Sequence, residues 1–151
     1  MKIEAVEQLI EANAAIVDVS GPKDEELIRK AEDHLGVKFP SSYREFLKKW
    51  GTLGFGPDEF YGVIDGDFEA SSVPDAVWFT AKKRRELQLP HELVPVFNAD
   101  GDEYYCLDTS RLDESGECPV VIWDVATRQV IGDKAATFSE FLWARLSDFV
   151  S

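Results

Sequence analysis

The histidines and cysteines of this sequence lack the spacing that catalysis or metal binding requires. His34 and His91 have no Ser or Cys nucleophile pattern nearby and no second ligand at i+4. Cys106 and Cys118 form no CxxC or Cys–His pattern. We therefore expect the histidines to lie at a helix end and in a loop. The cysteines are expected to be buried free thiols in a reducing compartment, with a redox role as the alternative.

A run of oxygen-bearing side chains is the one segment that suggests a cation site. It contains Asn98, Asp100, Asp102 and Glu103. An EF-hand loop needs glycine at its sixth position, whereas Gly101 stands fourth in this run. An Asp-Gly hairpin turn accounts for the same residues more simply. Because no carboxylate pair is singled out by its spacing either, the sequence predicts no catalytic residue, no cofactor, no metal and no enzymatic activity.

The net charge of −13 over 151 residues narrows the class of partner. Binding to nucleic acid requires a basic face, so we expect no nucleic-acid partner. A negative surface would instead speed and orient the approach of a basic protein, or it would serve solubility alone. The acids are unevenly distributed: residues 51–81 contain six and no Lys or Arg, and residues 92–151 contain twelve against four basic residues.

The hydrophobic spacing predicts the helices that would position these acids. They are expected over residues 2–16, 22–35, 42–50, 72–85 and 137–149. The third helix carries one apolar stripe at i, i+3, i+4 and i+7, formed by Tyr43, Phe46, Leu47 and Trp50. Gly36 is expected to follow the end of the second helix. Ser72 and Thr137 are expected to cap the fourth helix and the last helix. Ser42 and Glu45 have the spacing of a capping box, in which each side chain satisfies the other's backbone N–H.

The second half of the chain is predicted to form strands, over residues 60–64, 93–97, 103–108 and 119–123. Pro95 indicates a sheet edge or a bulge, because proline cannot donate to the ladder. The expected fold is a single α+β domain over residues 1–151, a mainly antiparallel sheet flanked by N-terminal helices and a C-terminal helix. The N-terminus lacks the pattern of a signal peptide, and no segment approaches the roughly 18 apolar residues of a membrane span. We therefore expect a cytoplasmic protein with no membrane partner.

With these elements placed, the chain resembles the SUKH superfamily, which groups bacterial immunity proteins with a yeast cell-wall assembly regulator domain. The resemblance covers roughly residues 25–150 and rests on five segments in the family's order. The most specific is the Leu-Gly-x-x-x-Pro-x-x-Tyr spacing from Leu35 to Tyr43, followed by Phe46-Leu47. The other segments are Gly54-Phe55, Asp100–Asp108, Cys118–Asp124 and Thr137–Leu142.

The resemblance implies a non-enzymatic binding module. Bacterial members of the family bind and neutralise a cognate protein toxin, often a nuclease or deaminase. A monomer or weak homodimer is expected. The predicted contact face is the acidic stretch 58–69 with the hairpin at 100–103, and exposed aromatic side chains would anchor the partner. The candidate partner-binding residues are Phe55, Asp58, Glu59, Tyr61, Asp65, Asp67, Glu69, Trp78, Asp100, Asp102 and Glu103.

Two other functions stay open at this point. A scaffold of the same fold would bind an endogenous protein with no toxin involved, and gene neighbourhood would separate it from an immunity protein. An enzyme that binds a small molecule or metal would use the carboxylate clusters, which a metal analysis and a thermal-shift screen would test.

Overall fold

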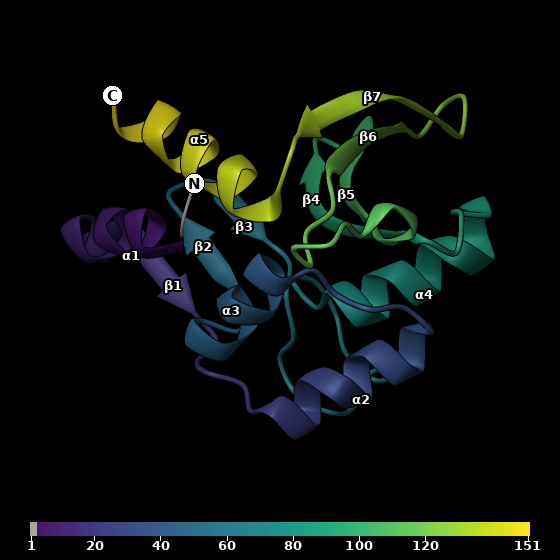
Figure 1. The fold of residues 1–151 in the computed structure, drawn as a ribbon, viewed down its shortest axis with the longest axis horizontal. Coiled ribbons are helices and arrows are strands. Elements are labelled where there is room, and N and C mark those ends of the chain that lie inside the picture. Colours follow the sequence, from purple (N-terminus) through teal and green to yellow (C-terminus); the bar gives the residue numbers. More distant parts are fainter. Residues whose placement is uncertain (1–2) are drawn as a thin grey trace.

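The computed structural model describes residues 3–151, and their secondary structure divides between helices and two antiparallel sheets (Figure 1). The helices are α1 (Ile3–Ala12), α2 (Glu25–Leu35), α3 (Ser41–Lys49), α4 (Ala76–Leu87) and α5 (Phe138–Val150). The strands are β1 (Val17–Val19), β2 (Leu53–Phe55), β3 (Asp58–Phe60), β4 (Leu93–Ala99), β5 (Glu103–Asp108), β6 (Val120–Asp124) and β7 (Gln129–Ala135). The predicted α+β class is confirmed.

The strands form two sheets where the sequence predicted one. β1, β2 and β3 make a three-stranded sheet, and β4 to β7 make a four-stranded meander in chain order. The strand expected at 60–64 is replaced by β3, which ends at Phe60. Leu53–Phe55, where no strand was predicted, is β2. Strands of three residues are too short to show a period of two, so hydrophobic alternation could not reveal them.

The four-stranded sheet begins as its sequence predicts. β4 is an outermost strand, and its register with β5 shifts between Pro95 and Phe97. Both features suit proline, which has no N–H to donate to a ladder. The β4–β5 turn places Asp100 at φ 55° and Gly101 at φ 82°. The predicted Asp-Gly hairpin is therefore confirmed, and it turns the acids of this segment toward solvent.

The apolar stripe of α3 is buried at the centre of the molecule. Tyr43, Phe46 and Leu47 are completely inaccessible to solvent. The rings of Tyr43 and Phe46 both pack edge-on against Phe138 of α5, at centroid distances of 4.9 and 5.2 Å. The Tyr43 hydroxyl donates to the carbonyl oxygen of Tyr61 at 2.8 Å. Burial of this stripe confirms the prediction, and α3 packs against α1, α2 and α5.

The predicted capping box at the start of α3 is wrong. The helix begins at Ser41, and a carboxylate from a distant loop satisfies its first turn. Glu117 accepts hydrogen bonds from the Ser42 backbone N–H at 3.0 Å and the Ser42 hydroxyl at 2.8 Å. The Gly116 carbonyl accepts from the Ser41 N–H at 2.8 Å. Glu45 stays exposed, because the helix N-terminus already has a carboxylate from the C-terminal half of the chain.

Three other helix starts or ends differ from expectation. α1 ends at Ala12, before the short strand β1, and the first residue of the predicted helix lies outside the described residues. α2 is capped by Asp24 and does not begin at Pro22, and α4 is capped by Asp75 in place of Ser72. In both cases a carboxylate accepts from the N–H groups of the first turn. The predicted cap of α5 by Thr137 and the left-handed Gly36 after α2 are confirmed.

Backbone contacts outside the ladders hold the two sheets together. The Tyr61 N–H donates to the Val96 carbonyl at 2.8 Å, so the chain leaving β3 runs beside β4. α5 packs against α1, α3 and β7, and α4 packs against β4 (Figure 1). This arrangement brings the β2–β3 turn close to the β4–β5 hairpin. Within the described residues, no helix is both long and apolar enough to cross a membrane.

Candidate partner-binding surface

Four of the predicted partner-binding residues line one groove, here called the acidic groove. It measures about 460 Å³ and lies between the β2–β3 turn, the β4–β5 hairpin and α5. Asp58 and Glu59 lie in β3, Tyr61 follows β3, and Asp100 lies in the β4–β5 hairpin turn. The structure thus brings together acids that are about 40 positions apart in the sequence.

One wall of the acidic groove is fixed by Arg145 of α5. Its Nε lies 2.9 Å from Asp58 Oδ2, and its Nη2 lies 3.4 Å from Asp58 Oδ1. The guanidinium also lies 4.7 Å from the ring centroid of Phe97 on β4. The hydrogen bonds to Asp58 raise the pKa of Arg145 above its ordinary value. Arg145 therefore holds one carboxylate of the groove in place and neutralises it.

The other acids of the groove stay open to solvent. Glu59 and Asp100 are both exposed, and neither forms an ion pair with any of residues 3–151. The Asp100 turn is held by Asn98, whose side-chain oxygen accepts from the Gly101 N–H at 2.8 Å. The ionised side chains of the lining are Asp58, Glu59, Asp100 and Arg145, three carboxylates against one guanidinium. The groove consequently favours a positively charged ligand.

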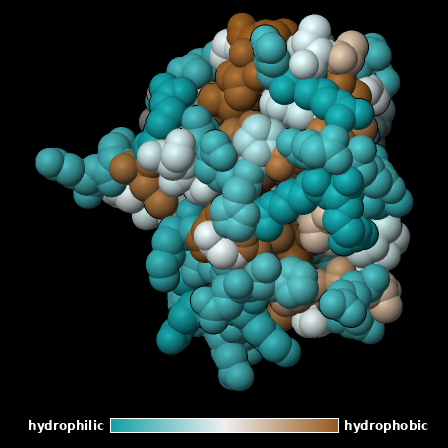
Figure 2. Space-filling view, turned by 90° about the vertical axis from the view of Figure 1, so that its right-hand side faces the viewer, coloured by the Kyte–Doolittle hydropathy of each residue, from teal (hydrophilic) through white to brown (hydrophobic). Residues whose placement is uncertain are grey.

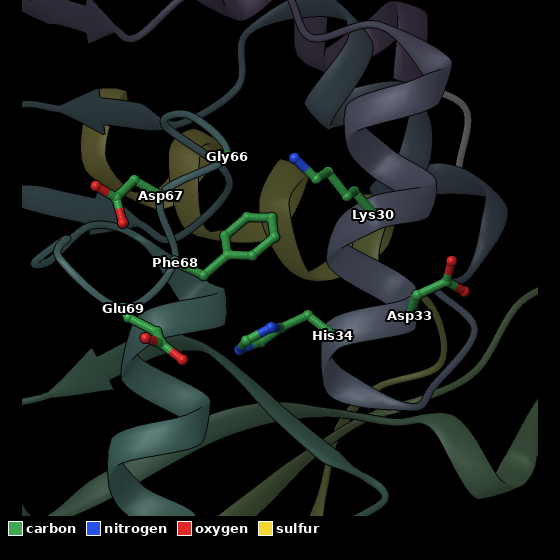
Figure 3. Close-up of a pocket in the computed structure, with 7 residues that line it drawn as sticks. All are labelled: Lys30, Asp33, His34, Gly66, Asp67, Phe68 and Glu69. Atoms are coloured by element: carbon green, nitrogen blue, oxygen red, sulfur yellow. The ribbon is translucent and has the colours of Figure 1, made fainter.

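Two more predicted residues, Asp67 and Glu69, line a second and separate hollow (Figure 3). It lies between α2 and the 66–69 loop and measures about 510 Å³. The Phe68 ring points toward α2 and packs against His34, at a centroid distance of 5.1 Å. Lys30 of α2 reaches toward the loop from above Phe68 (Figure 3). Charges of both signs meet here, so this hollow lacks the uniform polarity of the acidic groove.

The carboxylates of the 65–70 loop are partly committed to the loop's own backbone. Asp65 Oδ1 accepts from the Asp67 N–H at 2.9 Å. Asp67 Oδ1 accepts from the Ala70 N–H at 3.3 Å. Such bonds hold the turn and leave less of each carboxylate for a partner. The acidic stretch 58–69 therefore divides between two sites and does not form one continuous face.

The prediction that Phe55 and Tyr61 are exposed anchors is wrong. Phe55 is 0% exposed and Tyr61 is 5% exposed. Phe55 points into the core because it alternates with Gly54 in β2, and its ring packs against Phe149. Tyr61 is among the residues that line the groove, and its ring packs edge-on against Phe79 at 5.1 Å. Neither ring offers a partner the accessible apolar area of an anchor.

The remaining predicted residues lie outside the groove. Trp78 is half-buried on α4, as expected, with Lys82 Nζ 5.5 Å from its ring centroid. Asp102 is exposed at the hairpin tip, where its carbonyl accepts from the Val125 N–H. Glu103 is half-buried and stands opposite Asp124 in the β5–β6 ladder. These residues surround the hairpin without lining the hollow beside it.

Sequence reasoning missed Arg145, Tyr105 and Asn98 as lining residues of the acidic groove. Arg145 lies 87 positions from its partner Asp58, and no local sequence pattern predicts a contact over that separation. Tyr105 was assigned only to a strand, although the alternation in β5 was a signal that Tyr104 and Tyr105 face opposite sides of the sheet. The tyrosine that faces the α5 side is the one that reaches the groove.

The histidines and cysteines lie in structural positions. His91 Nε2 is 3.3 Å from the carbonyl oxygen of Gly36, at the end of α2. Cys106 and Cys118 are free and buried, as predicted. Burial raises the pKa of both thiols, that of Cys118 to about 12. Among residues 3–151, no three His, Cys, Asp or Glu side chains are placed to share a metal ion.

An apolar sheet edge is the other surface that the sequence did not predict. β7 is the outermost strand of its sheet, and Val130 and Ile131 are 47% and 57% exposed. Figure 2 shows apolar side chains (brown) at the upper end of the molecule, where β6 and β7 lie in Figure 1. The ion pair between Arg111 and Asp133 places charges on the same strand, and charges of this kind discourage pairing with another strand.

Comparison with known proteins agrees with the fold and with the resemblance of the sequence segments. A crystal structure of a protein from Pseudomonas syringae pv. tomato is similar, with a TM-score of 0.62 and 27% sequence identity over 94% of each chain. The family model SUKH_5, described as SMI1-KNR4 cell-wall, matches residues 3–146. The chain therefore belongs to the SUKH superfamily.

Proposed function

We propose that this protein is an immunity protein that binds and neutralises a cognate toxin domain with a basic surface, such as a nuclease. Membership of the SUKH superfamily supports a protein-binding role without catalysis. The observation that carries the proposal is the acidic groove, where Glu59 and Asp100 are exposed and form no close ion pair among the described residues. A basic toxin would supply the cationic partner.

The charge of the whole molecule supports the same partner class. At a net charge of −13, the protein attracts a basic domain over about a Debye length, roughly 8 Å at physiological salt. Complementary fields of this kind raise association rates, and the groove then selects the orientation of the complex. Inhibition requires only that the bound protein covers the toxin's own ligand site. No chemical step by the immunity protein is needed.

Co-expression with the toxin domain encoded beside the gene tests the proposal. The wild-type protein should restore growth and should copurify with the toxin. The variant Glu59→Lys/Asp100→Lys should lose both properties. Glu26→Lys/Glu114→Lys makes the same change of charge at exposed residues outside the groove, and it should keep both. Failure of the wild-type protein to rescue growth and to form a complex would overturn the proposal.

A scaffold that binds an endogenous protein is the second candidate, and the cell-wall description of the matched family favours it. Such a scaffold would use the same acidic surface without a toxin. Gene neighbourhood separates the two functions, because an immunity gene stands beside the gene of a large secreted toxin protein. A pull-down from the source cell, with the Lys variants as controls, would identify an endogenous partner.

A further inference from the structure

The inner wall of the acidic groove carries a tyrosine hydroxyl that the fold leaves unused. Tyr105 lines the groove and is only 7% exposed. Its ring stacks on Phe97 at a centroid distance of 5.6 Å and packs edge-on against Phe141 at 5.7 Å. Within residues 3–151 its hydroxyl makes no hydrogen bond. This packing fixes the Tyr105 ring, and the unpaired hydroxyl at its end is accessible to a ligand in the groove.

The acidic groove already contains one bound guanidinium, that of Arg145. This group pairs with Asp58 through two nitrogen atoms and lies over Phe97. The arrangement combines a carboxylate with an aromatic face, which suits the planar, multiply donating guanidinium better than an ammonium group. Tyr105 stacks on the same Phe97, and Lys134 Nζ lies 4.9 Å from the Tyr105 ring centroid. The aromatic and carboxylate side chains around the groove therefore already hold cationic groups of the protein itself.

The acceptors left over in the groove match a second guanidinium. Glu59 and Asp100 are exposed and unpaired within the described residues, and they come from different sheets. Asn98 holds the Asp100 turn through the Gly101 N–H, so the hairpin acid is presented from a fixed backbone. An anion is disfavoured, because the lining has three carboxylates against one guanidinium. A nucleic acid or an anionic membrane is disfavoured for the same reason.

We propose that the acidic groove receives an arginine side chain of the bound protein, with its guanidinium between Glu59 and Asp100 and one N–H donated to the Tyr105 hydroxyl. The inference rests on the proposed function, in that the arginine belongs to the toxin. On this inference, the acidic groove is the part of the larger acidic surface that selects the partner protein. The rest of that surface then contributes to the association rate and little to the choice of partner.

The full-length protein and a blocked arginine peptide, acetyl-Gly-Arg-Gly-amide, test the proposal directly. Amide chemical shifts in NMR spectra should change for Glu59 and for residues 98–101 as the peptide is added, with an affinity in the millimolar range. The matched citrulline peptide has the same shape without the charge and should leave these amides unchanged. Equal shifts with both peptides, shifts confined to the 66–69 loop, or no shift at all would overturn the proposal.

Two variants test the assigned contacts. Tyr105→Phe keeps the ring and removes the hydroxyl, and it should weaken the arginine peptide about fivefold. Glu59→Gln/Asp100→Asn changes only exposed side chains, so folding is kept, and it should abolish peptide binding. Glu26→Gln/Glu114→Gln is the control and should bind as the wild type does. Unchanged affinity in Glu59→Gln/Asp100→Asn would contradict the assignment even if Tyr105→Phe proved unstable.

The same variants separate this inference from the function on which it rests. If the wild-type protein rescues cells from the toxin but binds no arginine peptide, the groove inference fails and the immunity function stands. If the peptide binds in the groove but no toxin is neutralised, the immunity function fails while the arginine site stands. When both hold, the affinity for the toxin should fall in Glu59→Gln/Asp100→Asn and stay unchanged in the control.

Discussion

Arg145 of α5 and Asp58 of β3 form a two-point ion pair across 87 residues of sequence, with N–O distances of 2.9 and 3.4 Å. Because Arg145 also lies over Phe97 of β4, one side chain joins the last helix to both sheets. This relationship decides the shape of the acidic groove. Loss of the ion pair between Arg145 and Asp58 should therefore lower both the stability of the protein and its affinity for the partner.

Removal of this ion pair should destabilise the protein by a measurable amount. We expect Asp58→Asn or Arg145→Gln to lower the free energy of unfolding by about 1 kcal/mol, since solvent screens the partly exposed Arg145. In a double-mutant cycle measured by urea unfolding, the two effects should couple. The exposed pair Arg111 and Asp133 is the matched control and should couple less. Strictly additive effects at Asp58 and Arg145 would contradict the prediction.

Asp75 should make stability depend on pH in the direction opposite to that of an ordinary surface carboxylate. It is completely buried, and burial raises its pKa above 3.8 although the N–H groups of Val77 and Trp78 act to lower it. The native state then holds the proton more tightly than the unfolded state. The free energy of unfolding contributed by Asp75 is therefore greatest at low pH and decreases as the pH rises through the native pKa.

Asp75→Asn tests this prediction because asparagine caps a helix as well as aspartate but carries no charge. Urea unfolding across a pH series should show a smaller fall in stability above about pH 4 in this variant. At pH 7 the variant should be at least as stable as the wild type. Asp75→Ala removes the cap and should cost about 1 kcal/mol. If Asp75→Asn lost as much stability at pH 7 as Asp75→Ala, the buried charge would not be the cause.

Glu117→Gln should weaken the start of α3. Glutamine offers one acceptor oxygen where the carboxylate offers two, so its NH₂ group would face a donor of Ser42. We expect a loss of about 1–2 kcal/mol in the free energy of unfolding. Glu45→Gln, at the position that the capping-box pattern favoured, should have no effect. If Glu45→Gln lowered the unfolding temperature more than Glu117→Gln, Glu45 and not Glu117 would be the carboxylate that caps α3.

Both cysteines should resist thiol reagents in the native protein. Cys106 and Cys118 are 0% and 2% exposed, and their raised pKa values leave almost no reactive thiolate at pH 8. Reaction with a chromogenic disulfide should therefore be slow in buffer and should reach two thiols per chain in guanidinium chloride. Rapid modification of either thiol without denaturant would show that its surroundings open readily.

The parts of this fold that sequence predicts are those fixed by neighbours along the chain. The α3 stripe from Tyr43 to Trp50, the turn at Asp100-Gly101 and the Thr137 cap each depend on residues within one or two turns of each other, and all are observed. Pro95, which has no N–H to donate, predicted a sheet edge or a bulge, and the structure shows both. Such local patterns act through neighbouring residues, so the structures that they predict are also found in the folded protein.

The parts that failed depend on contacts between distant residues. The Ser42 and Glu45 spacing was a valid local pattern, yet a carboxylate 75 positions away occupies the site. Phe55 and Tyr61 were predicted as exposed aromatic anchors, but the packing of the two sheets buries them. The acids of the groove were predicted, whereas Arg145 was not, because only the tertiary fold brings α5 to β3.

The bond between Glu117 and Ser42 has a consequence for synthesis of the chain. As the protein leaves the ribosome, α3 emerges long before the carboxylate that completes its first turn. The Phe138 ring that covers its apolar stripe emerges later still. The first turn of α3 is therefore completed, and its apolar stripe covered, only after the last quarter of the sequence has been translated. A nascent chain arrested before that point exposes the apolar stripe to chaperones.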